Sequence, residues 1–187
     1  MSLRELIDEP FALLLEMERR AKAAMASRGG ADEAAEEWIG VAFRLGPQVF
    51  VTSRADVREV LPAPEQVTRV PGSKPWLRGI ANVRGQLLTI VDLKAFLGAG
   101  PTQGDRRARM LLLASRDVPT AVLVDEVLGF RRFAASDYQQ EAPKAEVRCE
   151  HYLAGGYRQG TGVFPQFDLS RLLADPSFLN AGALKAG

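Results

Sequence analysis

The chain has 187 residues, of which 47% are hydrophobic and 25% are charged, and its formal net charge is +1. This length and composition are typical of a folded globular protein with one domain of ordinary size or two very small ones, and they exclude a disordered chain. The balanced charge excludes a strong overall attraction to nucleic acid or to anionic lipid.

Residues 1–37 are expected to form an N-terminal helix and a linker. Pro10 suits the first turn of a helix over residues 10–25, whose apolar side chains recur mostly on one face. Small and acidic residues dominate 27–37, as they do in linkers. The acidic N-terminus does not fit a signal peptide, and no run approaches the roughly 18 apolar residues of a membrane span. Because a single cysteine also suits a reducing compartment, a cytoplasmic location without direct membrane insertion is expected.

Short apolar runs rich in Val and Ile follow, separated by Gly, Pro and polar residues, and such runs are typical of buried β-strands. A polar stretch over 134–150 is expected to be a long loop, and a helix is expected over 169–174. The expected strands are 38–45, 48–52, 57–61, 67–70, 79–83, 87–93, 110–114 and 120–127, with a strand-rich stretch over 152–167.

The segment over 75–98 contains the clearest local signals. Arg84-Gly85 separates two apolar runs, which favours a tight hairpin because glycine adopts backbone angles that cost other residues energy. Asp92 stands at the N-cap position of a short helix over 93–97, and Gly98 is placed to end that helix. These signals predict a small β-barrel with an arginine on its turn.

The order of these elements recurs later in the chain. Residues 57–61 read VREVL and residues 124–128 read VDEVL. Each is followed by a hairpin with Gly and Arg and then by Asp-Leu before a short helix, at Asp92 in the first copy and at Asp168 in the second. A hairpin before a helix is common in β proteins, so this pattern can recur without any structural repeat. The alternative is that the chain contains a pair of similar small barrels.

Catalysis requires a positioned base, nucleophile, metal or cofactor. Cys149 and His151 would share a face if their segment were a strand, but the chain has no other cysteine or histidine to complete a metal site. An isolated pair of this kind is more often structural or simply exposed. We therefore expect no catalytic residue, no metal and no cofactor. An enzyme that uses these two residues ranks third among the possible functions, behind the two described below.

Two arginine clusters, Arg106-Arg107-x-Arg109 and Arg131-Arg132, raise the second alternative, a nucleic-acid-binding small β-barrel. Such barrels use a basic groove with interleaved aromatic residues. Only Phe130 and Phe133 flank the second cluster, and aromatic residues make up 7% of the chain. A charged strand edge, which discourages aggregation, explains the same arginines without a ligand, so no nucleic-acid partner is expected.

Four separated motifs occur in a specific order: Val57-Arg58-Glu59-Val60, Asn82-Val83-Arg84-Gly85, Ile90-Val91-Asp92-Leu93 and the stretch over 122–127. In this order they resemble the motifs of the CheW-like coupling proteins, the adaptors that join chemoreceptors to a histidine kinase. The resemblance extends from about residue 38 to about residue 173.

This resemblance implies a mainly β fold with two small SH3-like five-stranded β-barrels packed on each other, an N-terminal helical extension and short helices. The CheW-like domain would span 38–175, and a tail would follow at 176–187. The first barrel would occupy about 47–98. The second would take about 38–46 and 105–173, because the family lets its first strand cross into the second barrel.

The resemblance also implies a non-catalytic adaptor that is recruited to membrane-associated receptor arrays. It would hold the regulatory domain of a CheA-like histidine kinase against the cytoplasmic tip of a methyl-accepting chemoreceptor. Arg84 and Glu59 would rim a groove with an apolar floor, although a partly exposed salt bridge is the neutral explanation of this pair, and each floor residue could equally be core. The expected partner-binding residues are Arg84, Glu59, Val57, Val60, Gly79, Asn82 and Val127.

The flanks of these motifs resemble one branch of the family. A helical extension and then Trp38, Gly40, Phe43 and Arg44, in the pattern W-x-G-x-x-F-R, look like the coupling protein of the chemosensory system that governs type IV pili. A role in the control of twitching motility is therefore implied.

Overall fold

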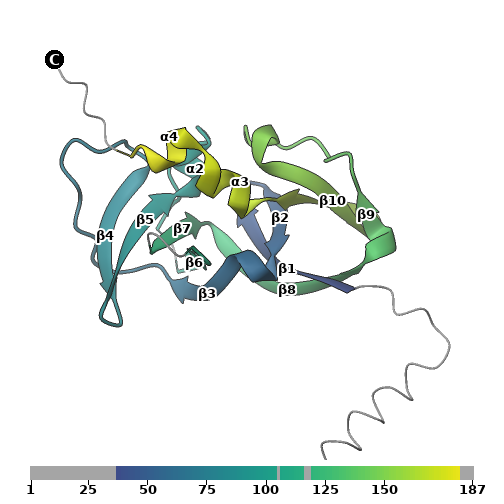
Figure 1. Ribbon diagram of the computed structural model, residues 1–187, viewed down its shortest axis with the longest axis horizontal. Coiled ribbons are helices and arrows are strands. Elements are labelled where there is room, and N and C mark those ends of the chain that lie inside the picture. The colour runs from purple at the N-terminus through teal and green to yellow at the C-terminus, as the bar shows by residue number, and fades with distance from the viewer. Residues whose placement is uncertain (1–36, 105, 116–118, 182–187) are drawn as a thin grey trace, which may run out of the picture. The chain divides into compact units, whose positions relative to one another are not determined.

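The computed structural model describes residues 37–104, 106–115 and 119–181. The predicted helix over 10–25 and all but the last residue of the linker lie outside the described residues. Within the described part, eleven strands form two sheets, and short helices connect some of them (Figure 1). The predicted mainly β class is confirmed.

The first sheet has six strands in the order β8–β1–β2–β11–β10–β9. The second has five strands in the order β3–β6–β7–β5–β4. The strands of the first sheet are β1 (Glu37–Leu45), β2 (Gln48–Ser53), β8 (Glu126–Ala134), β9 (Tyr138–Gln139), β10 (Leu153–Gln159) and β11 (Gly162–Phe167). Those of the second are β3 (Val57–Pro62), β4 (Leu77–Val83), β5 (Gln86–Asp92), β6 (Arg109–Leu113) and β7 (Thr120–Val124).

The described helices are all short. Asp92 and Asp168 accept hydrogen bonds from backbone N–H groups at the starts of α2 and α3, as N-cap residues do, so both predicted caps are confirmed. The helices are α2 (Leu93–Phe96), α3 (Leu169–Ala174) and α4 (Pro176–Leu179), with 3-10 turns η2 (Arg54–Asp56), η3 (Ala135–Asp137) and η4 (Glu150–Tyr152).

The strands are divided between the sheets differently from the predicted barrels. The prediction places β2 in the first barrel, but β2 pairs with β1 and β11. It places β6 and β7 in the second barrel, but they pair with β3 and β5. The five-stranded sheet therefore takes the continuous stretch 57–124, and the six-stranded sheet takes 37–53 and 126–167. The short Gly46-Pro47 turn explains the place of β2, because consecutive strands joined by a tight turn tend to pair in one sheet.

The predicted strand over 120–127 is in fact two strands, β7 and β8, which belong to different sheets. The chain changes sheet at Asp125, whose Oδ2 accepts a hydrogen bond from the backbone N–H of Gly46 at 2.6 Å. The ammonium of Lys94 on α2 lies 3.3 Å from Oδ1 of the same carboxylate. Asp125 thus joins the β1–β2 turn to α2 at the point where the two sheets meet.

Three further segments differ from the prediction. Of residues 67–70, only Thr68 pairs, in an isolated bridge with Ile80 of β4. The loop over 134–150 contains η3 and the short strand β9, which is the sixth strand of its sheet. The predicted tail begins with α4, because Asp175 caps this helix by accepting a hydrogen bond from Ser177 N–H.

The two sheets repeat one arrangement, which confirms the repeat in the sequence. In the order of each sheet, β8, β1, β2, β11 and β10 correspond to β3, β6, β7, β5 and β4. The central β2–β11 and β7–β5 pairs are parallel, and the other pairs are antiparallel. β9 and Thr68 hold equivalent outer places. The six-stranded sheet is therefore a circular permutation of the five-stranded one.

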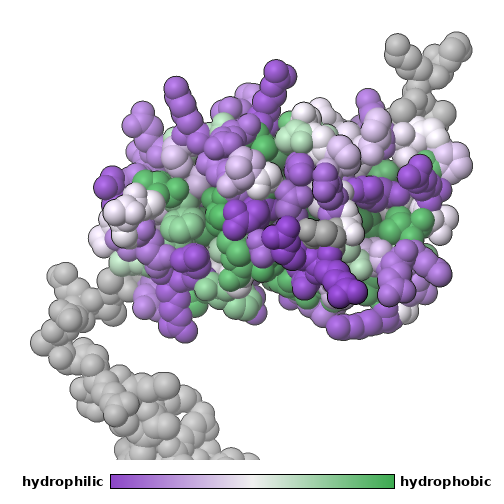
Figure 2. All heavy atoms as spheres, turned by 180° about the vertical axis from the view of Figure 1, so that it is seen from behind, coloured by the Kyte–Doolittle hydropathy of each residue, from purple (hydrophilic) through white to green (hydrophobic). Residues whose placement is uncertain are grey.

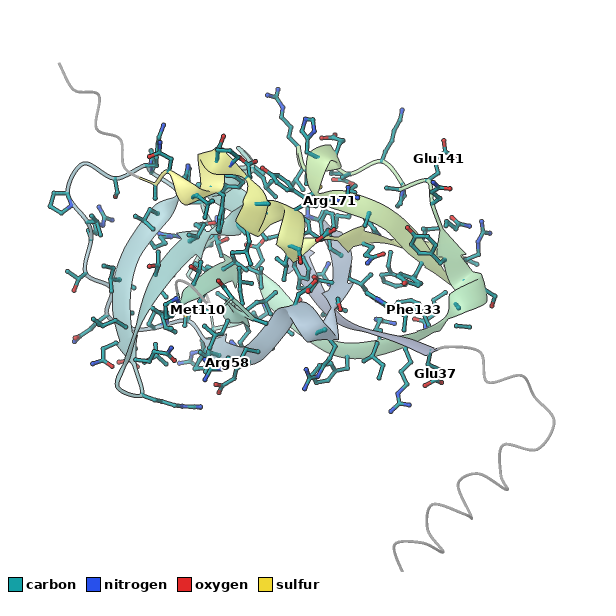
Figure 3. All side chains as sticks on the ribbon, in the orientation of Figure 1. Glu37, Arg58, Met110, Phe133, Glu141 and Arg171 are labelled. Carbon is teal, nitrogen blue, oxygen red and sulfur yellow. The ribbon has the colours of Figure 1, made fainter. Side chains whose placement is uncertain are left out.

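Three apolar cores hold this arrangement together. The largest lies between the sheets and takes residues from both, including Phe43, Phe50 and Phe167, whose ring centroids are 5.8, 6.0 and 6.2 Å apart. A second cluster surrounds Met110 inside the five-stranded sheet, and a third surrounds Phe133 inside the six-stranded sheet (Figure 3). Two small units thus pack on each other through the large shared core.

Gly79 and Gly155 occupy equivalent bulges in β4 and β10, with φ of 135° and 137°. A Cβ on Gly79 would lie 2.1 Å from the Thr68 carbonyl oxygen, and one on Gly155 would lie 2.5 Å from that of Gln139. Both sites therefore require glycine, for the backbone angle and for the close approach of a neighbouring strand.

We expect Gly79→Ala to destabilise the protein by about 2 kcal/mol, because the new methyl group adds backbone strain and pushes Thr68 away. Urea unfolding of the purified chain measures this change. The matched control is Gly104→Ala, since a Cβ on Gly104 meets nothing within 4 Å and its φ is not positive. Equal stabilities of the two variants would contradict the assignment.

Candidate partner-binding surface

The β4–β5 hairpin turns at Arg84-Gly85, as predicted. Both residues have positive φ, 53° and 83°, which defines a tight turn of the type that suits twisted strands. The side chain of Asn82 supports this turn, because its Oδ1 accepts a hydrogen bond from Gly85 N–H at 2.9 Å. Asn82 therefore positions the arginine.

Arg84 contacts the far edge of its own sheet. Its Nη1 donates to Oε1 of Glu59 at 2.6 Å, so the ion pair joins β3 to the β4–β5 hairpin, and β3 and β4 are the two edge strands. The side chains remain 72% and 41% exposed. The predicted proximity of Arg84 and Glu59 is thus present, and an exposed pair of this kind adds only about 0–1 kcal/mol to stability.

The backbone of Arg84 is strained, and its exposed ion pair offsets this strain without a net gain in stability. Within the described residues it is the single non-glycine residue with positive φ. A side chain in this left-handed region costs roughly 1 kcal/mol relative to glycine, about as much as the exposed ion pair returns. Glycine at this position would serve the turn better. The arginine therefore points to a role beyond folding.

Bulges in β3 and β8 bring apolar side chains to the edge of the shared core. The register of β3 shifts between Val57 and Glu59, so that Val57 and Val60 oppose the core residues Leu113 and Leu111. Val57 is 4% exposed and belongs to the core, which is the alternative that the sequence left open for each floor residue. Val60 is half-buried and packs against the same core.

The bulge in β8 has the same effect. Val127 opposes Phe43 and Phe130 opposes Val41, with Leu128 as the extra residue between the paired positions. Phe43 and Val41 belong to the core between the sheets, so Val127 and Phe130 lie on its face. Val127 is half-buried, whereas Phe130 is 65% exposed.

Phe130 also lies close to the start of β3. The guanidinium of Arg54 on η2, three residues before Val57, lies 5.9 Å from the centroid of the Phe130 ring. We use the name β3–β8 surface for a set of exposed and half-buried residues on η2, β3, β8 and the β4–β5 turn. They are Glu59, Val60, Arg84, Val127, Leu128, Phe130 and Arg54.

Of the predicted residues, the β3–β8 surface includes Arg84, Glu59, Val60 and Val127. Gly79 lies inside β4 and serves the sheet, as described above. Leu128 and Phe130 are not among the predicted residues. The spacing Val127-x-x-Phe130 gave no clear signal, because two apolar residues three apart share a strand face only where a bulge lies between them.

One carboxyl group beside this surface, that of Asp56, has a shifted pKa. Burial raises the pKa of the Asp56 carboxyl on η2, and the negative charge of Asp168 raises it further.

On the face shown in Figure 2, which is seen from behind relative to Figure 1, apolar areas are interspersed with polar side chains. Apolar residues with hydrophilic neighbours are therefore a feature of this face.

Cys149 and His151 do not form a catalytic pair in this structure. Cys149 is buried, and burial together with the charge of Glu150 raises the pKa of its thiol to about 12. A thiol of this kind is a poor nucleophile. His151 lies on η4 and is exposed. Among the described residues, no group of three or more His, Cys, Asp or Glu is placed to hold a metal ion.

The predicted basic clusters are engaged within the chain. Arg131 donates to Gln159 at 2.9 Å and its guanidinium lies 4.9 Å from the Phe164 ring centroid. Arg132 pairs with Glu37 at 3.1 Å, and Arg109 donates to backbone carbonyls of its own loop. These contacts favour a structural role over a nucleic-acid groove.

Comparison with known proteins decides the family. The model of the CheW-like domain matches residues 40–177. The chain belongs to the CheW-like family. Its members are non-catalytic coupling adaptors of chemosensory systems, and they couple receptors to the CheA kinase.

Two curated relatives are similar over most of this CheW-like chain. Protein PilI of Pseudomonas aeruginosa is 34% identical over 153 residues, which is 82% of this chain and 85% of PilI. Protein FrzA of Myxococcus xanthus is 29% identical over 120 residues, 64% of this chain and 73% of FrzA. The motif flanks thus predicted the correct branch, since PilI is the relative that they resemble.

A solved structure shares the fold. The crystal structure of the scaffolding protein TtCheW from Thermoanaerobacter tengcongensis superposes with a TM-score of 0.61 and covers 70% of this chain and 88% of TtCheW, at 19% identity. In the described residues of the present CheW-like protein, no helix is both long and apolar enough to cross a membrane.

Proposed function

We propose that this CheW-like protein couples the cytoplasmic tip of a methyl-accepting chemoreceptor to the regulatory domain of a CheA-like histidine kinase. It would do so in the cytoplasm, at membrane-associated receptor arrays that control type IV pilus twitching motility. The likeness to PilI over 82% of the chain supports the pilus system in particular.

The β3–β8 surface is proposed as the receptor site, and the strained Arg84 is the observation that carries this assignment. A receptor tip is helical, and a helix is recognised by an apolar floor with a polar rim. Val60 and Val127, which pack against the shared core, and the exposed Phe130 supply the floor. Arg84 supplies a fork of donors that is 72% exposed and held in place by Glu59.

Substitution of Arg84 tests this proposal. We expect Arg84→Ala and Arg84→Gly to weaken binding of a receptor-tip fragment by about tenfold, because either change removes a charge-assisted hydrogen bond. Their stabilities should differ, since Arg84→Gly also relieves the backbone strain and should melt at or above the wild-type temperature. Calorimetric titration with the fragment and thermal unfolding give the two readouts.

Binding to the kinase regulatory domain is the control for these variants, and it should be largely retained. If both variants bound the receptor fragment with the wild-type affinity, Arg84 would have only a structural role. Loss of kinase binding together with receptor binding would indicate a general disturbance of the hairpin.

A further inference from the structure

A cavity of about 620 Å³ lies on the side of the molecule away from the β3–β8 surface. Its lining comes from the loop before β4, from α2, from η4 and from the start of α4. In Figure 1, α2 and α4 run along the upper edge of the described part, whereas β3 and β8 lie along the lower edge. The cavity is therefore a separate place, where the two halves of the fold meet.

Two half-buried aromatic rings line the cavity, and both are fixed. Trp76 lies parallel to Phe178, with ring centroids 6.1 Å apart and an angle of 2°, and the Phe96 ring meets Trp76 edge-on at 5.2 Å. The backbone of the Trp76 loop is also held, because the Trp76 carbonyl accepts a hydrogen bond from Asp92 N–H at 2.8 Å. The cavity is thus preformed, and its volume falls within the usual range for small-molecule sites.

Basic side chains complete the lining. Lys74, Arg148 and His151 line the cavity, and none of these three side chains forms an ion pair or a hydrogen bond with another residue of the described part of the chain. The lining has one carboxylate, Asp175, which already accepts hydrogen bonds from the Tyr152 hydroxyl and from Ser177 N–H. Lys74 and Arg148 are therefore available to a ligand, and these two positive charges exceed the single negative charge of Asp175.

We infer that this cavity binds a small anion with a planar ring, of the nucleoside monophosphate class. The base would stack on Trp76 and meet the perpendicular Phe96 ring at its edge, since aromatic side chains stack on every base. The phosphate would pair with Arg148 and Lys74, because a guanidinium fits phosphate oxygens with two parallel hydrogen bonds. This site is independent of the receptor surface.

Calorimetric titration of the full chain with 5′-AMP and 5′-GMP tests the inference. At least one nucleotide should bind with a Kd below about 1 mM, and its nucleoside and inorganic phosphate should each bind at least about tenfold more weakly. Arg148→Glu and Lys74→Glu should each weaken nucleotide binding at least about tenfold, the change expected for loss of a charge-assisted hydrogen bond.

The matched control is Lys144→Glu, an equal charge reversal on the same loop as Arg148 but outside the cavity lining. It should leave the affinity within about twofold, as expected for a charge screened by solvent. The inference is overturned if neither nucleotide binds at about 1 mM. It is also overturned if Lys144→Glu matches Arg148→Glu, or if an acidic peptide binds to these cations while both nucleotides fail to bind.

Discussion

Asp92→Ala is expected to destabilise the protein by about 3 kcal/mol, because it removes the centre of a buried polar network. The Asp92 side chain is 1% exposed and lies 2.9 Å from the Arg78 guanidinium. It also accepts hydrogen bonds from both the backbone N–H and the hydroxyl of Thr102, each at 2.9 Å, and from Ala95 N–H at 3.1 Å. Without the carboxylate, these donors lose their partner in a buried site. Urea unfolding with an unchanged slope would measure the loss.

Asp168→Ala is the matched control, since Asp168 holds the equivalent place in the repeat and caps α3. Its side chain is 26% exposed and accepts hydrogen bonds from Ser170 and Arg171 N–H groups at 2.9 and 3.1 Å. Removal of such a cap costs about 1 kcal/mol. If the two variants lost equal stability, capping alone would account for Asp92, and the network would carry no extra energy.

Local signals in the sequence predicted the local structure. Arg84-Gly85 and Asp92 lie where a hairpin turn and a helix N-cap require particular residue types, and neighbouring residues alone determine both features. The repeat was visible for the same reason. In each copy, neighbouring residues alone predict a hairpin followed by a capped helix.

Long-range contacts set the features that the sequence did not predict. The stretch over 120–127 has no local mark at Asp125 that distinguishes a continuous strand from a crossing between sheets. The burial of Asp92 depends on Thr102, ten residues away across a loop. The exposure of Phe130 depends on which strand pairs with β8. The alternation of apolar and polar residues around Arg131-Arg132 did not indicate that β1 is this strand.

Phe130→Asp is expected to cause the largest loss of receptor binding, at least about 30-fold, because it places a charge in the centre of the proposed apolar floor. Folding should change little, since the ring is 65% exposed and the Arg54 guanidinium lies 5.9 Å from its centroid. Leu179→Asp is the matched control, because Leu179 on α4 is also 65% exposed but lies outside the β3–β8 surface. Titration of a receptor-tip fragment against the wild type and both variants separates the two positions.

If Leu179→Asp weakened binding as much as Phe130→Asp, or if neither variant weakened it, the receptor site would have to lie elsewhere. If Phe130→Asp alone fails to bind while its melting temperature is retained, Val60, Val127 and Phe130 form the floor on which the receptor tip packs.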